Sequence, residues 1–412
     1  MNTVDEALAL VVEHAGGREI HRAALDELVG RVLAEDVSAD EDSPPFDKSM
    51  MDGFAVRAAD VSARMPLSIV GEIRAGAANP GTIGDGETAA IMTGAPMPIG
   101  ADAVVVVERC RVIDGMMTTD VESCQPGLNI LQRGFEYKKG DVVLAAGRVL
   151  MPAEVGLLAS VGRNYAKVSR QQRVGILATG DELVAAGGAI GPGQIRDSNT
   201  PTLFALLEAA GAEHFSAGLA KDNAEELERL IKQGLTYDIL LLTGGVSMGT
   251  ADLIPQTLAK LGVNEVFHKV ALKPGMPVWF GTHAKGLVFG LPGNPISVLA
   301  CFELFVTTAL RARQGWADPL PRFFNARLES DFNYPTKRET YHPANLTFAD
   351  DGPVVSPVPW FGSADVLGAS RADALVVLPV GAGEHKTGDR LRVLPLSKPG
   401  WIWTCSGAGG AS

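Results

Sequence analysis

The sequence contains few of the residues that mark several common classes of protein. Among 412 residues there are only four cysteines: Cys110, Cys124, Cys301 and Cys405. They are widely spaced and form no C-x-x-C pair, so we expect neither a zinc site nor a disulfide framework. A reducing compartment is the simplest setting for such a chain.

Long apolar runs and an excess of basic charge are also missing. No stretch approaches the ~18 uninterrupted apolar residues of a membrane span. The first ten residues carry Asp5 and Glu6, whereas a secretory signal begins with a basic segment and an apolar core. The formal net charge of −12 disfavours a broad nucleic-acid surface, because an acidic field repels phosphates. We therefore expect a cytoplasmic protein that binds neither membrane nor nucleic acid.

What the chain does contain is typical of a globular protein with several domains. Hydrophobic residues make up 46% and charged residues 20%, enough apolar material to fill cores. A chain of this length exceeds what one core usually serves. Apolar residues between Val4 and Val37 recur at three and four positions, which predicts amphipathic helix.

The later segments alternate between two patterns. Short apolar runs separated by Gly and Pro predict β structure from residue 45 to about 140 and again after Asp318. Between Arg173 and Gln314, strand-like runs alternate with helical spacing, which predicts a parallel sheet covered on both faces. The fold class is therefore multidomain α/β plus β, and the last β segment is expected to be a small barrel or sandwich. We expect domains at 1–44 with 137–172 (helical/β linker), 45–136 (β-rich), 173–317 (α/β) and 318–396 (β-barrel), and a flexible tail at 397–412.

The glycine-rich loop Thr243-Gly-Gly-Val-Ser-Met-Gly249 follows an apolar strand and precedes a helix. Glycines at such a place let backbone amides approach a phosphate-like anion. The loop lacks the Gly-Lys-Ser/Thr of a Walker A motif and the spacing of a dinucleotide fingerprint. A turn needed only for chain reversal is the alternative.

Three carboxylates follow strands of the same segment: Glu182, Asp222 and Asp252. In a parallel sheet the carboxyl ends of the strands share one edge. Carboxylates beside a phosphate loop suit magnesium-assisted cleavage of an anhydride. Taken singly, Asp222 and Asp252 are equally good helix N-caps.

Lys269 and Lys273 lie four residues apart, before Pro274. On one strand this even spacing would place both ammonium groups on one face, where they would suit an oxyanion or a developing phosphate charge. The alternative is a pair of solvated surface lysines.

Six motifs now resemble, in order, those of the molybdopterin molybdenumtransferase family, the MoeA type also found as the C-terminal part of gephyrin. They are Pro44-Pro-Phe-Asp-Lys-Ser-Met-Met-Asp-Gly-Phe-Ala-Val56, Ile91-Met-Thr-Gly-Ala-Pro96, Thr179-Gly-Asp-Glu-Leu183, Gly244-Gly-Val-Ser-Met-Gly249, Leu272-Lys-Pro-Gly275 and Gly290-Leu-Pro-Gly-Asn-Pro-Ile-Ser297. The resemblance runs from the first helix to the last β segment. Ordered agreement of many motifs is more specific than any single loop.

The resemblance implies an elongated subunit with a molybdopterin-binding three-layer α/β domain. It also implies a homodimer whose active site is shared between chains, and contact with a molybdopterin adenylyltransferase. The implied reaction inserts molybdenum from molybdate into adenylyl-molybdopterin, with magnesium-dependent release of AMP. These residues do not distinguish molybdate from tungstate.

The family's functional positions transfer to this chain residue by residue. The catalytic positions are Asp52, Thr93, Glu136, Glu182, Asp222, Asp252, Lys269 and Lys273. Asp222 and Asp252 are expected to hold Mg²⁺. The molybdopterin and AMP phosphates are expected at Gly244, Gly245, Ser247, Gly249, Pro292, Asn294 and Pro295. Arg338 and Ser363 are expected to bind molybdate.

Four positions depart from the family pattern. Glu136 stands where the family has Asp, and Met276 where it usually has Lys. In the last β segment the family's Arg falls near Pro343 and its Asn near Asp373. Since that Arg is associated with oxyanion binding, Arg338 and His342 are the candidates to replace it.

Two other functions remain as alternatives. A stand-alone molybdopterin adenylyltransferase shares the α/β domain but lacks the segment from Asp47 to Glu136. A scaffold protein that lost the reaction would fit the changes at Met276 and Pro343. Retention of the acids and both lysines together favours an enzyme.

Overall fold

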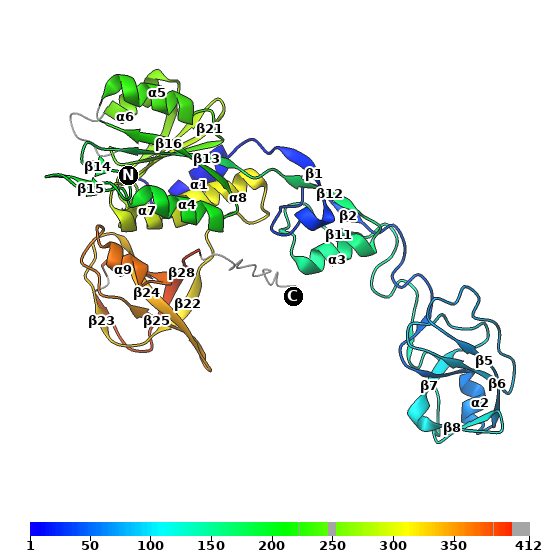
Figure 1. Cartoon of the computed structure of the whole chain (residues 1–412). Helices are drawn as coiled ribbons and strands as arrows, with labels where there is room; N and C mark the ends of the chain where they lie inside the picture. The colour runs from blue at the N-terminus through cyan, green and yellow to red at the C-terminus, as the bar shows by residue number, and fades with distance from the viewer. Residues whose placement is uncertain (222, 246–252, 382, 398–412) are drawn as a thin grey trace. The chain divides into compact units, whose positions relative to one another are not determined.

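The computed structural model describes residues 1–221, 223–245, 253–381 and 383–397 (Figure 1). Contacts divide the chain into two compact units. The larger unit comprises Met1–Ala34, Gly147–Met151 and Lys167–Ser412, and the smaller unit comprises Glu35–Ala146 and Pro152–Ala166. The tail predicted to be flexible lies, from residue 398 onward, outside the described residues.

A six-stranded mixed sheet forms the centre of the larger unit. Its order is β16-β13-β17-β21-β20-β18, in which the first four strands are parallel and the pairings of β20 with β21 and with β18 are antiparallel. The strands are β13 (Arg173–Thr179), β16 (Glu213–Ala220), β17 (Ile239–Thr243), β18 (Asn264–His268), β20 (Trp279–His283) and β21 (Gly286–Leu291). A short parallel pair, β14 (Leu183–Val184) and β15 (Ile195–Arg196), follows β13.

Helices cover both faces of this sheet, as predicted (Figure 1). They are α1 (Val4–His14), α4 (Asn199–Ala209), α5 (Ala224–Gly234), α6 (Leu253–Lys260), α7 (Pro295–Cys301) and α8 (Thr307–Gln314). Alternate residues of one strand serve opposite cores: Ile239 and Leu241 pack with α1, α4, α7 and α8, whereas Leu240 and Leu242 pack with α5 and α6. Strands buried on both faces explain why these segments read as continuous apolar runs.

The longest helix is Pro295–Gln314, in which a π-helical turn, η3 (Phe302–Val306), joins α7 to α8. By length and composition alone this helix could cross a membrane. However, 78% of its most apolar 18-residue stretch is buried inside the protein, as in the core helix of a soluble protein.

The C-terminal part of the larger unit is a small barrel. β24, β25, β22, β28 and β26 pair in that order, and an additional pairing between β24 and β26 closes the ring. Their bounds are β22 (Phe324–Leu328), β24 (Glu339–Ala349), β25 (Gly352–Pro357), β26 (Ala374–Leu378) and β28 (Arg390–Pro395). β19 (Leu272–Lys273) joins the ring through β24, and β23 (Phe332–Asn333), β27 (Glu384–His385) and α9 (Val366–Ser370) lie between its strands in sequence.

The predicted helix across Val4 to Val37 is only half right. α1 begins with a capping box between Thr3 and Glu6 and ends at His14. After α1 the chain forms strand β1 (Ile20–Ala24) and the short turn η1 (Leu25–Glu27), and then Val32 and Leu33 pair as isolated β-bridges with Val149 and Val168. Long-range pairing and the positive φ of +80° at Gly30 override the helical spacing there.

The smaller unit is mainly β structure around a sheet of order β7-β4-β6-β5-β9-β8. These strands are β4 (Gly53–Val56), β5 (Leu67–Ile73), β6 (Glu87–Ile91), β7 (Ala103–Val106), β8 (Cys110–Ile113) and β9 (Met116–Thr119). The remaining elements of the unit are β2 (Val37–Ser38), β3 (Lys48–Ser49), α2 (Ala58–Ser62), η2 (Val107–Arg109), β10 (Ile130–Leu131), β11 (Val142–Leu144) and α3 (Pro152–Ser160). β1 (Ile20–Ala24) lies in the larger unit and β12 (Tyr165–Ser169) where the chain passes between the units. The predicted fold class, α/β plus β with a terminal barrel, is confirmed, while the finer four-part division of the chain stays a prediction.

Candidate functional site

The carboxyl ends of β13, β17 and β21 bring several predicted site segments together. The N–H of Gly244, just after β17, donates to Leu291 O at the end of β21, at 3.4 Å. Asn199 Nδ2, at the start of α4, donates to Thr243 Oγ1 at 2.9 Å and to Gly293 O at 2.7 Å. The glycine loop and the Pro292–Pro295 loop therefore adjoin at the sheet edge where α/β proteins bind ligands.

Glycine is required where the chain leaves β17. Gly244 has φ +87° and Gly245 φ +58°. A Cβ at Gly244 would lie 2.3 Å from Thr179 O at the end of β13. Beside them, Asn199 Oδ1 is buried and has no hydrogen-bond partner among the described residues. The continuation of the loop with Ser247, Gly249 and Asp252 lies outside the described residues.

Glu182 lies on the same edge, in the loop after β13. Its side chain is exposed and lies against Gly180, where an added Cβ would be only 2.5 Å from Glu182 Oε2. Lys221 holds this loop, because its Nζ donates to Asp181 O at 2.9 Å and Leu183 O at 3.1 Å. Asp222, the next residue, lies outside the described residues.

The Pro292–Pro295 loop contacts the barrel segment that carries Ser363. Pro295 begins α7 and Asn294 occupies its N-cap position, yet the Asn294 side chain makes no capping bond. Instead, Asn294 Nδ2 donates to Ser363 Oγ at 2.7 Å, and Ile296 N donates to Ser363 O at 3.0 Å. Two residues predicted for different ligands, phosphate and molybdate, are thus hydrogen-bonded to each other.

The prediction that Lys269 and Lys273 share one strand face is wrong. β18 ends at His268, and Lys269 has φ +70°, a left-handed conformation that is uncommon for a lysine. Lys273 lies in β19, which pairs with β24 of the barrel. The even spacing failed because the chain leaves one sheet and enters another between the two lysines.

Lys273 is held by aromatic side chains of the barrel. Its Nζ lies 4.7 Å from the Tyr334 ring centroid and 5.6 Å from that of Trp360, and it donates to Tyr334 Oη at 2.8 Å. The ring faces stabilise the ammonium group by cation–π attraction. Arg338 approaches the same strand, because its Nη1 donates to Leu272 O at 3.2 Å. The predicted cations Lys273 and Arg338 are therefore both linked to the short strand β19.

His342 cannot supply the charge of the missing family arginine. It is buried between aromatic rings, with Tyr334 at 4.9 Å and Trp360 at 5.0 Å between centroids. Burial lowers the pKa of His342 to about 4, and the nearby Lys273 acts in the same direction. Pro343 itself is buried in β24. Arg338 is left as the candidate for the role.

In the smaller unit, Asp52 and Thr93 form a pair. The N–H and the hydroxyl of Thr93 each donate to Asp52 Oδ1 at 2.7 Å. These two bonds lower the pKa of Asp52 below its ordinary value. Glu136 Oε2 accepts a bond from Ser43 Oγ at 2.6 Å, so the longer carboxylate at this position is fixed by a hydroxyl.

A metal site is not assembled within the part of the chain that the structure describes, where no group of three or more His, Cys, Asp or Glu could hold an ion. Both predicted magnesium ligands, Asp222 and Asp252, lie outside that part.

Three family models match the chain in sequence order. The MoeA N-terminal region (domain I and II) matches residues 2–162, the probable molybdopterin binding domain matches 175–312, and the MoeA C-terminal region (domain IV) matches 325–396.

Curated relatives align over nearly the whole length. The molybdopterin molybdenumtransferase of Staphylococcus aureus (strain Mu50) is 33% identical over 397 residues, covering 95% of this chain and 94% of the relative. That of Bacillus subtilis (strain 168) is 33% identical over 413 residues, covering 97% and 96%. The chain belongs to the molybdopterin molybdenumtransferase family. The solved molybdopterin biosynthesis MoeA protein of Pyrococcus horikoshii OT3 has the same fold, with a TM-score of 0.82 at 28% identity over 96% of this chain and 100% of that one.

Membership of the molybdopterin molybdenumtransferase family confirms the resemblance and the prediction of a transferase. The alternative of a stand-alone adenylyltransferase is not supported, because the alignments include the segment from Asp47 to Glu136.

Sequence reasoning missed three residues that organise this molybdopterin molybdenumtransferase-type site. Asn199 joins two loops of the sheet edge, and Tyr334 and Trp360 flank Lys273. Asn199 stands at a helix start and had a readable signal, since Asp197 Oδ1 caps that turn by accepting from the N–H of Asn199 and Thr200. Tyr334 and Trp360 had no such signal in the sequence, because only folding brings these barrel residues next to Lys273.

Proposed function

We propose that this protein inserts molybdenum from molybdate into adenylyl-molybdopterin and releases AMP, as part of molybdenum cofactor biosynthesis in the cytoplasm.

The observation that supports this proposal most strongly is the junction of the glycine loop with the Pro292–Pro295 loop. Asn199 joins the two loops, and Asn294 reaches Ser363 of the barrel. Backbone amides of glycines at a strand end suit phosphate oxygens. Lys273 and Arg338 supply positive charge for an oxyanion in the same unit.

In this proposal the Gly244–Gly245 turn holds the phosphate of the pterin side chain. Water adds to the phosphorus of the pterin phosphate, the bond from that phosphorus to the bridging oxygen breaks, and AMP leaves with the bridging oxygen while the proton of the water is released. Lys273 stabilises negative charge that develops on the phosphate or belongs to molybdate. Its aromatic surroundings fix the ammonium group before the substrate arrives, so less ordering is needed on binding.

Magnesium is proposed to bind at Asp222 and Asp252. Carboxylate oxygens are the ligands that this hard cation prefers. When bound, it would neutralise charge on the anhydride.

We also propose a homodimer in which each active site uses both chains. The Asp52–Thr93 pair belongs to the smaller unit and the glycine loop to the larger one. A two-fold dimer contains two equivalent composite sites of this kind.

The proposal is tested by incubating the purified protein with adenylyl-molybdopterin, magnesium and either molybdate or tungstate, and following AMP. AMP release that requires both magnesium and an oxyanion supports it. Failure to release AMP under all these conditions, with a folded protein, contradicts it.

A further inference from the structure

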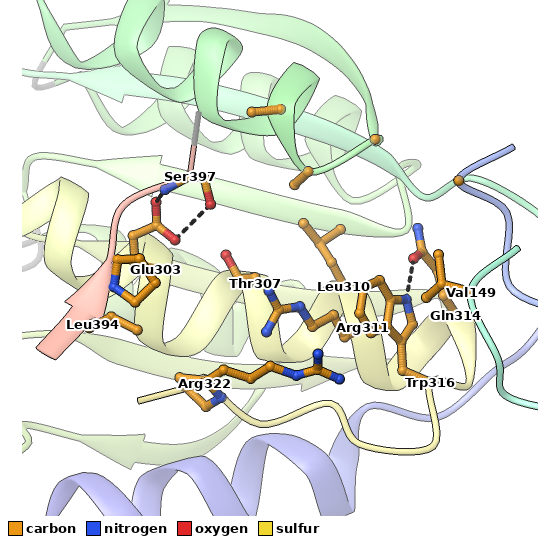
Figure 2. Close-up of a pocket in the computed structure, with 16 residues that line it drawn as sticks. Val149, Glu303, Thr307, Leu310, Arg311, Gln314, Trp316, Arg322, Leu394 and Ser397 are labelled. Atoms are coloured by element: carbon orange, nitrogen blue, oxygen red, sulfur yellow. Dashed lines mark hydrogen bonds between the residues drawn. The ribbon is translucent and has the colours of Figure 1, made fainter. Parts of the chain in front are cut away.

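One cavity of the larger unit lies apart from the candidate functional site. It has a volume of about 180 Å³ and lies between the C-terminal half of the helix Pro295–Gln314, the end of α4 and the end of β28 (Figure 2). Its apolar walls include Ala210, Leu310, Pro321 and Leu394. Among the described residues, none predicted for the reaction lines it.

Two arginines extend into this cavity. Figure 2 shows the side chains of Arg311 and Arg322 alongside each other, between Trp316 at one end and Leu394 at the other. Arg311 is half-buried: its guanidinium lies 5.1 Å from the Trp316 ring centroid and its Nη1 donates to Leu320 O at 3.2 Å. Packing on an indole face fixes the plane of the guanidinium and leaves its edge for an acceptor.

Burial lowers the pKa of Arg311. The positive charge of Arg322 also lowers it, whereas the carboxylates of Glu303 and Asp318 raise it. The two guanidiniums are thus close enough to repel each other where water is restricted. An anion placed between them would be stabilised by both positive charges.

The polar atoms around the arginines are unevenly satisfied. Glu303 is buried, and its two carboxyl oxygens accept bonds from Ser397 N at 2.7 Å and Ser397 Oγ at 2.9 Å. Thr307 Oγ1, by contrast, is buried and has no partner in the described part of the chain. A buried hydroxyl without a partner costs free energy that a bound acceptor would recover.

The backbone here is also unusual. The π-helical turn η3 immediately precedes Thr307. Such turns occur mostly as single insertions in α-helices and are frequent at functional sites.

The geometry points to a binding site for a small organic carboxylate in this cavity, its oxygens between Arg311, Arg322 and the Thr307 hydroxyl and its apolar body against Leu310 and Leu394. The planar guanidinium matches a carboxylate through paired hydrogen bonds. The volume is comparable to an engineered cavity of about 150 Å³ that holds benzene, so a molecule of the size of benzoate fits. The apolar walls favour an organic body over a bare inorganic ion.

The site is tested with 4-fluorobenzoate by ligand-observed fluorine NMR on the full chain, with 4-fluorobenzamide as an uncharged control of the same shape. We expect the carboxylate to bind with a Kd of about 1 mM or tighter, and the amide at least ~10-fold more weakly. Equal binding of the two probes contradicts a charge-directed site. Displacement of the probe by inorganic phosphate as readily as by unlabelled benzoate shows an inorganic anion site and overturns the proposal.

Variants then locate the probe. Arg322→Gln should weaken binding ~10-fold or more and Thr307→Val ~3- to 10-fold, by loss of bonds to a charged acceptor. Ala210→Leu, which fills the cavity and keeps both arginines, should abolish binding. Arg229→Gln removes the same charge from the exposed surface of α5 and should change nothing.

Thermal unfolding of each variant confirms that it is folded, and if Thr307→Val does not fold, the other two variants decide. Unchanged binding in folded Arg322→Gln or Ala210→Leu overturns the proposal. The readout is binding alone, so the outcome is independent of the proposed reaction.

Discussion

Asp52 and Thr93 are joined by two hydrogen bonds to a single carboxylate oxygen, one from the backbone and one from the hydroxyl, both at 2.7 Å. They come from sequence positions 41 apart, just before β4 and just after β6. The pair favours the ionised form of an exposed acid. A carboxylate of fixed orientation and charge is the form that general-base or electrostatic roles require.

The first prediction concerns this pair. Thr93→Val removes the hydroxyl bond and keeps the backbone bond, so the pKa of Asp52 should rise, while Thr93→Ser should leave it unchanged. Because the carboxylate form is then lost at a higher pH, the acidic limb of AMP release should move to higher pH in Thr93→Val. Carboxyl ¹³C titration by NMR measures the shift. An Asp52 pKa identical in wild type and Thr93→Val contradicts the assignment of its cause.

The second prediction compares two glycines with positive φ. A Cβ added at Gly244 (φ +87°) would lie 2.3 Å from Thr179 O. A Cβ added at Gly262 (φ +80°) would have no atom within 4 Å. Alanine at either position has to adopt a left-handed conformation, at about 1–2 kcal/mol. Only Gly244→Ala should lose more free energy of unfolding than this, and only it should weaken substrate binding, by ~10-fold or more. Urea unfolding and titration with adenylyl-molybdopterin measure both effects. Equal behaviour of the two variants would show that the turn has no special role.

The third prediction concerns the pH dependence of stability. The pKa of His342 falls to about 4 in the folded chain, against ~6.5 in an unfolded one. The unfolded chain therefore binds the proton more readily, and the stabilisation is complete above about pH 6.5 and lost as the pH falls towards 4. Between pH 7 and pH 4.5 the loss should be about 2 kcal/mol, measured by denaturant unfolding at both pH values. His342→Gln should flatten this dependence, and an unaltered slope in that variant would point to another group.

Much of the fold was readable because its signals are local. The runs Val174-Gly-Ile-Leu-Ala and Asp238-Ile-Leu-Leu-Leu-Thr correspond to β13 and β17, and the predicted helix from Thr200 to Ala210 is α4 at Asn199–Ala209. The segment after α1 was misread, because pairing of Val32 and Leu33 with distant residues decides its structure.

The site was readable only where a motif or a strand end marked it. The motifs containing Gly244 and Asn294 led to the sheet edge where these residues lie, and their roles stay predictions. The prediction that Lys269 and Lys273 lie on one strand face was wrong, because the chain leaves the α/β sheet and joins the barrel between these two residues. The neutral state of His342 depends on burial among Tyr334 and Trp360, which no local pattern encodes.

The fourth prediction concerns assembly. If each site uses Asp52 from one chain and Asp252 from the other, mixing Asp52→Ala and Asp252→Ala chains regenerates one intact site per mixed dimer. After random exchange about half the dimers are mixed, so roughly a quarter of wild-type AMP release should return. Differently tagged chains allow the mixed dimer to be isolated. Activity no higher than that of either parent, in a dimer shown to be mixed, excludes a shared site.

The most direct test of the proposed reaction is the stoichiometry of a single turnover with excess enzyme over adenylyl-molybdopterin, in the presence of magnesium and molybdate. We predict one molybdenum atom in the pterin product for each AMP released, and a decrease of AMP release by about 10²–10³-fold in Asp252→Asn. Molybdenum in the product is measured by mass spectrometry and AMP by chromatography. AMP released without molybdenum entering the product, or wild-type turnover by Asp252→Asn, would contradict the account.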